Sequence, residues 1–71
     1  MDEKTAIEIR DYALSAIKNL NSALNAAHEK CSDEDFEKLK KFVGTSMGNI
    51  DIDILWFLYK KFPEIDDLKE Q

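Results

Sequence analysis

The chain is 71 residues long and carries 15 acidic and 10 basic residues, which gives a net charge of −5. A chain of this length forms at most one domain, and so small a core supplies only about 3–5 kcal/mol of stability by itself. No basic stripe of the kind that binds nucleic acid is present, and the acidic balance disfavours anionic membranes. We therefore expect a single domain, residues 1–71, with no nucleic-acid or membrane partner.

The cysteine content and the N-terminal segment bear on where the protein is found and what stabilises it. Cys31 is the only cysteine, so no internal disulfide can form, and a lone thiol suits a reducing compartment. The N-terminal segment is charged, and no uncharged run, such as 42–50, approaches the ~20 residues of a membrane span. These features predict a cytoplasmic protein that relies on helix packing or on oligomerisation.

Apolar residues at steps of three and four predict a first helix over about residues 4–30. Its apolar positions are Ala6, Ile9, Ala13, Ile17, Leu20, Leu24, Ala27 and Cys31. Thr5 followed by Glu8 is a capping-box pattern at its start, and His28 and Lys30 suit the negative end of its dipole. Only Cys31-Ser32 remains as a loop, and so short a connection makes consecutive helices antiparallel neighbours.

A second helix is predicted over about residues 33–62, with Ser32 as its N-cap and Pro63 as its stop. At about 100° per residue its apolar residues fall on two opposite faces. The face expected to pack on the first helix holds Phe36, Leu39, Val43, Met47, Ile50, Ile54 and Phe57. The opposite face holds Gly44, Gly48, Ile52, Leu55 and Tyr59, with Trp56 beside them. A helix that is apolar on two faces needs two neighbours.

Two alternatives to a regular second helix remain open. The alternation of Ile and Asp over residues 50–54 is typical of a strand, with Gly48-Asn49 as a turn. A helix kinked near Gly48-Asn49 is the other alternative. After Pro63, the tail 63–71 either forms a short helical turn anchored by Ile65 and Leu68 or frays.

Residues with catalytic or ligand-binding chemistry are few. His28 and Cys31 stand three apart and could touch one metal ion, but two ligands do not make a site; His28 on a helix could also accept a phosphoryl group. Asp51 and Asp53 are two apart and so point to different faces of a helix. We expect no catalytic, cofactor or metal residues and no cofactor, and therefore no enzyme.

Gly44-x-x-x-Gly48 is a small-residue pattern that lets two helix backbones approach closely. The close contact is either within the hairpin or between two subunits. Because both glycines lie on the face opposite the first helix, we expect an intersubunit contact that includes Gly44, Gly48, Ile52, Leu55, Trp56 and Tyr59.

The residues Val43-Gly44-x-x-Met47-Gly48-x-Ile50, then Leu55 to Tyr59 and Phe62-Pro63-Glu64-Ile65, resemble a group of small bacterial helical proteins. The resemblance covers roughly residues 30–68. It implies a bacterial source and brings no activity with it.

The sequence as a whole predicts an all-α antiparallel helical hairpin that dimerises into a four-helix bundle. The expected function is that of a non-enzymatic, homodimeric protein–protein interaction module. One alternative is an acidic antitoxin-like or immunity-like binder of a basic protein, motivated by the six acids and three bases of residues 49–71. The other is a metal-binding or phosphotransfer bundle that acts through His28.

Overall fold

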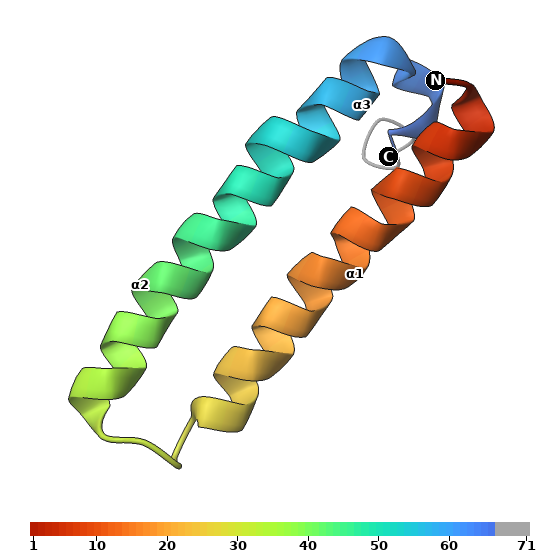
Figure 1. The fold of residues 1–71 in the computed structure, drawn as a ribbon. Coiled ribbons are helices and arrows are strands. Elements are labelled where there is room, and N and C mark those ends of the chain that lie inside the picture. Colours follow the sequence, from red (N-terminus) through yellow and green to blue (C-terminus); the bar gives the residue numbers. More distant parts are fainter. Residues whose placement is uncertain (67–71) are drawn as a thin grey trace.

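The computed structural model describes residues 1–66 and confirms the all-α helical hairpin (Figure 1). Helix α1 spans Glu3–Ala27 and α2 spans Asp33–Asn49. A π-helical stretch, η1 (Ile50–Leu55), and helix α3 (Trp56–Lys61) continue α2, and a 3₁₀ turn, η2 (Pro63–Ile65), follows. The hairpin is one layer thick, 45 × 24 × 16 Å in extent. Its radius of gyration, 14.7 Å, exceeds the about 11 Å expected of a compact chain of this length.

Helix α1 begins at Glu3, close to the predicted residue 4, but its capping residue differs from the predicted pattern. Asp2, not Thr5, is the N-cap, and its carboxylate accepts the backbone N–H of Thr5 at 2.8 Å. Hydrogen bonds from Thr5, through its side chain and its backbone, lower the pKa of Asp2 below its ordinary value. The cap therefore stabilises the folded chain above that ordinary pKa, and its contribution is lost as the pH falls through the lowered one.

The connection between the helices is longer than the predicted Cys31-Ser32. Helix α1 ends at Ala27 rather than at residue 30, and Glu29 has a φ of 72°, in the left-handed region. The ring of His28 packs edge-on against Phe36 with centroids 5.4 Å apart, which joins the two helix ends. Ser32 caps α2 as predicted, since its hydroxyl oxygen accepts the backbone N–H of Asp35 at 3.1 Å.

Replacing Glu29 by glycine is expected to stabilise the protein by up to about 1 kcal/mol, because a non-glycine residue in the left-handed region is strained by about that amount. Part of the gain is offset by the greater freedom of glycine in the unfolded chain. Urea unfolding followed by circular dichroism measures the change. Lys30→Gly is the control, because Lys30 has no such φ and the same substitution there should bring no gain.

The second helix begins at residue 33 as predicted and stops before Pro63, but it is not a regular α-helix. Within residues 1–66 no strand occurs, and the irregularity of the second helix begins directly after Gly48-Asn49. There the N–H of Trp56 donates to the carbonyl of Asp51, five residues earlier, as in a π-helix. A π turn inserts one extra residue into an α-helix, so the helix beyond it is rotated by about 100°.

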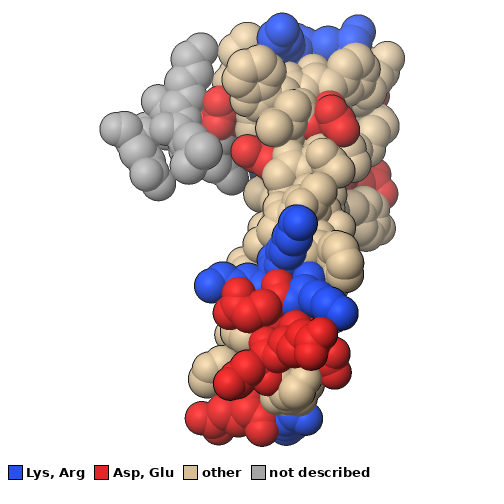
Figure 2. All heavy atoms as spheres, turned by 90° about the vertical axis from the view of Figure 1, so that its left-hand side faces the viewer, with Lys and Arg blue, Asp and Glu red and all other residues tan. Residues whose placement is uncertain are grey.

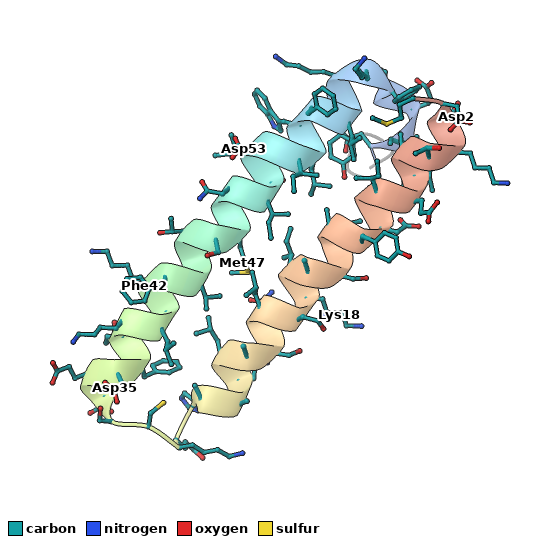
Figure 3. The ribbon with its side chains drawn as sticks, viewed as in Figure 1. Asp2, Lys18, Asp35, Phe42, Met47 and Asp53 are labelled. Atoms are coloured by element: carbon teal, nitrogen blue, oxygen red, sulfur yellow. The ribbon has the colours of Figure 1, made fainter. Side chains whose placement is uncertain are left out.

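This rotation changes the packing face. Of the side chains predicted to pack on α1, Ile54 and Phe57 are 41% and 51% exposed, so their placement was wrong. Leu39 is 40% exposed as well, but it lies before η1 and the rotation does not move it. Val43 is buried, and Met47 points from α2 toward α1 (Figure 3). Beyond η1 the buried residues are Leu55 and Leu58.

The main core cluster lies at the open end of the hairpin, where the N-terminus of α1 meets α3 and η2 (Figure 1). It is formed by Ala6, Leu58 and Ile65, with partly buried apolar side chains packed around them: Ile7, Ile9, Tyr59 and Phe62. The prediction that Ile65 anchors the C-terminal turn agrees with its 3% exposure. Leu68, the other predicted anchor, lies outside the described residues.

Arg10 joins η2 to α1. Its Nη1 donates to the carbonyl oxygen of Ile65 at 2.7 Å, and its Nε and Nη2 donate to Asp11 Oδ1 at 3.1 and 2.9 Å. The side chain of Arg10 is only 16% exposed, whereas that of Asp11 is 60% exposed. The hydrogen bond from Arg10 to Ile65 is therefore better shielded from solvent than the ion pair between Arg10 and Asp11.

Arg10→Met keeps the aliphatic stem and removes the donors, and we expect it to cost about 1–3 kcal/mol. Hydrogen exchange at the Ile65 and Asp66 amides should accelerate more than exchange in the middle of α1. Asp11→Asn is the control, because it weakens only the exposed ion pair, worth about 0–1 kcal/mol. Equal effects of the two substitutions would show that the Arg10–Ile65 contact does not hold η2 in place.

Candidate interaction surface

The surface of interest is the side of α2 and α3 that points away from α1. We define the outer row as Gly44, Gly48, Ile52 and Trp56, which follow one another at steps of four. In a regular α-helix such a row drifts by about 40° per step, or about 120° over three steps. The extra residue in η1 takes back about 100° of this drift. The π-helical stretch thus keeps the outer row on one side of the helix.

The two large side chains of the outer row, Ile52 and Trp56, are highly exposed. Ile52 is 62% exposed and Trp56 is 58% exposed. The ammonium of Lys60 lies 5.4 Å from the centre of the Trp56 ring, in reach of a cation–π contact that leaves most of the indole surface open. The outer row therefore presents two bulky apolar side chains to the surroundings.

The glycines of the outer row have no packing role inside the hairpin. A Cβ built at Gly44 or at Gly48 meets no atom within 4 Å outside the local helix. The sequence left open whether this pair serves close packing within the hairpin, and the structure decides against it. Any close approach that these glycines permit must involve something outside the described hairpin.

Two of the six predicted interface residues lie elsewhere. Leu55 is 3% exposed, so the prediction that it lies on the face opposite the first helix was wrong. Tyr59 is half-buried and packs on the core cluster at one side while lining a shallow hollow with Trp56, Lys60 and Asp66. Both departures follow from the extra residue in η1, which turns Leu55 and Tyr59 toward α1.

Sequence reasoning missed Phe42 and Phe57, which are 61% and 51% exposed. Phe42 and Asp53 lie on the side of α2–η1 away from α1 (Figure 3). Phe57 was assigned to the packing face because a regular helix would place it there. The one available signal was the five-residue step from Ile50 to Leu55, which continues the apolar series only if an extra residue is inserted.

A shallow depression lies beside the outer row on α2, lined by Glu37, Lys40, Lys41, Gly44 and Thr45. Thr45 donates its hydroxyl to the carbonyl oxygen of Lys41 at 3.0 Å, so the backbone satisfies this donor. Gly44 lowers the surface at one edge because it has no side chain. The depression is open, with charged side chains on its other edge.

Charge is distributed unevenly along this side of the molecule. The first turn of α2 carries Asp33, Glu34 and Asp35, with Glu37 after them, and the last turn of α3 carries Lys60 and Lys61. Figure 2 shows red gathered at the lower end, blue at the upper end and in the middle, and a largely tan upper half with a few separate red groups. This side is thus acidic at the start of α2 and basic at the end of α3, and the exposed Ile52 and Trp56 lie between these ends, near Asp51 and Asp53.

His28 and Cys31 are engaged in local contacts. His28 lies just past the end of α1 rather than on a helix, with its ring against Phe36. The thiol of Cys31 donates to the carbonyl oxygen of Ala27 at 3.0 Å. Within residues 1–66 no three His, Cys, Asp or Glu side chains are grouped so that they could hold a metal ion.

No helix in the described part of the chain combines the length and apolar character that crossing a bilayer would require. Comparison with known proteins found no matching family model, no similar curated protein and no similar solved structure.

Proposed function

We propose that this protein is a non-enzymatic protein–protein interaction module that works as a homodimer, in which two hairpins form a four-helix bundle. The outer row and its apolar neighbours make the contact between the subunits. Gly44, Gly48, Ile52 and Trp56 are the interface residues that we retain from the sequence prediction. Leu55 and Tyr59 support them from the side of the core.

One observation carries this proposal. Among the described residues, nine large apolar side chains are exposed, and two of them, Ile52 and Trp56, lie on the same side of the helix as the bare Gly44 and Gly48. Monomeric soluble proteins rarely expose apolar patches of more than a few hundred Å². A second copy of the same chain, related by a twofold axis, is the commonest way to cover such a face.

The shape of the hairpin supports the same conclusion. Two helices in a single layer share one interface, so each keeps an uncovered side, and only six apolar residues of the described chain are buried. Small domains of this size need a further source of stability, and the lone Cys31 excludes an internal disulfide. Pairing with a second hairpin would supply a second apolar layer.

Sedimentation equilibrium at micromolar concentration tests the proposal, with an expected mass of about 16 kDa, twice the 8.2 kDa of the chain. Trp56→Glu should shift the protein toward monomer, because it places a charge within the contact. Tyr12→Glu is the matched control: Tyr12 is 71% exposed on α1, and this change should leave the mass at that of the dimer. A compact, stable wild-type monomer at this concentration would refute the homodimer.

A further inference from the structure

We propose that the two copies pair through α2 and α3 in antiparallel orientation, with the twofold axis beside Gly48 and with Ile52 and Trp56 of each copy seated over the Gly44 depression of the other. This inference rests on the proposed homodimer and adds the orientation and register of its subunits. The Gly44 depression is the one lined by Glu37, Lys40, Lys41, Gly44 and Thr45.

The glycines and the large side chains of the outer row lie in separate halves of it. Gly44 and Gly48 come first and carry no side chain, and Ile52 and Trp56 follow with large exposed side chains. A parallel pairing would set Ile52 against Ile52 and Trp56 against Trp56, and would leave the two glycine segments facing an empty gap. An antiparallel pairing sets the large side chains of each copy against the glycine segment of the other, and both halves of the contact are then filled.

The register follows from distances along the helix. With the axis at Gly48, residues equally far before and after it face each other across the contact. The extra residue of η1 adds little length along the helix, so positions beyond it count as about one residue nearer to Gly48. Ile52 then faces Gly44 and Thr45, and Trp56 faces Lys41.

Charge selects the same orientation. Glu37 lies eleven residues before Gly48, and Lys60 lies twelve residues after it. Because the extra residue of η1 lies in between, Lys60 counts as eleven residues from Gly48, so Glu37 of one copy faces Lys60 of the other. The other acids at the start of α2 lie near Lys61 of the second copy. In a parallel pairing the acidic ends would face each other, as would the basic ends, and like charges in contact are unfavourable. Figure 2 shows these acidic and basic ends at opposite extremes of the same side.

The chemistry at the Gly44 depression fits an apolar guest with an aromatic ring. Thr45 already donates its hydroxyl to the carbonyl of Lys41, so covering it leaves no donor without an acceptor. Lys40 and Lys41 line the depression and can place an ammonium over the face of the incoming indole, as Lys60 does within its own chain.

Disulfide trapping tests the orientation. In a Cys31→Ser background, Glu37→Cys and Lys60→Cys are prepared as two separate proteins, both of unchanged helical content by circular dichroism. A disulfide requires Cα atoms within about 7 Å of each other. Mild oxidation of the equimolar mixture should give a covalent dimer containing one copy of each variant, identified by mass. Either variant oxidised alone should give at least tenfold less.

The outcomes separate the orientation from the dimer itself. A disulfide formed efficiently by either variant alone would mean a parallel pairing and would overturn the inference. No disulfide in any sample, with the reduced proteins still dimeric in the centrifuge, would place the contact away from the outer row. In both cases the proposed homodimer would stand. Reduced Cys31→Ser protein that is a stable monomer would refute the proposed function, and the inference with it.

Discussion

Leu58→Ala is expected to unfold much of the protein. Leu58 is 1% exposed and packs between Ala6 of α1 and Ile65 of η2, so it links three elements. Truncating a buried leucine costs about 2–5 kcal/mol, since the cavity closes only in part. A helical domain of this size has about 3–5 kcal/mol in its core, so the loss is comparable to the whole. Urea unfolding followed by far-ultraviolet circular dichroism measures it.

Phe57→Ala is the matched control. The substitution Phe57→Ala removes more atoms than Leu58→Ala does. Phe57 is 51% exposed, however, and the ammonium of Lys61 lies 5.8 Å from its ring centre. The loss of the Phe57 ring should therefore cost less than about 1 kcal/mol of stability. A regular α-helix from Val43 onward would turn Phe57 toward α1, as the sequence predicted. If Phe57→Ala proves more damaging than Leu58→Ala, α3 has the register of that regular helix, and the rotation at η1 does not occur.

Deleting Asp53 should leave the fold intact, although a deletion inside a packed helix is ordinarily severe. The π-helical stretch Ile50–Leu55 holds one residue more than an α-helix of the same length needs. Removing an exposed residue from it restores the α-helical hydrogen bonds and keeps Val43 and Leu58 on the side that faces α1. The urea midpoint should stay the same or rise, and the helical content should be unchanged.

Deleting Asn19 is the control for this experiment. Asn19 is equally exposed, but it lies in the regular α-helix α1. Its loss rotates the two parts of α1 by about 100° relative to each other, so Leu20 and Leu24 leave the packing face while Ala6 and Ala13 keep it. We expect a loss of at least about 2 kcal/mol from the exposure of these leucines. Deletions that cost the same at both sites would show that no residue of η1 is in excess.

The regular parts of the fold could be read from the sequence because they depend on nearby residues. Ser32, the acids after it and Pro63 fix the start and the end of the second helix through hydrogen bonds and steric limits that act within one turn. The short connection between two amphipathic segments then requires antiparallel packing. Local signals misled at the start of α1, where Asp2 rather than Thr5 caps the helix, and at its end, which comes at Ala27 rather than at residue 30.

The sequence by itself therefore determined the hairpin, its approximate boundaries and the presence of two apolar sides on the second helix. Only the tertiary structure decided which apolar residues face α1. In one helical register Ile54 and Phe57 face α1, and in the other their neighbours Leu55 and Leu58 do. The two pairs are equally apolar, so the sequence does not distinguish the registers. Packing of Leu58 with Ala6 and Ile65, which lie far apart in the sequence, favours the second pair and requires the extra residue of η1. That same rotation set the outer row, so four of the six predicted interface residues lie on the exposed side and Leu55 and Tyr59 turn toward the core.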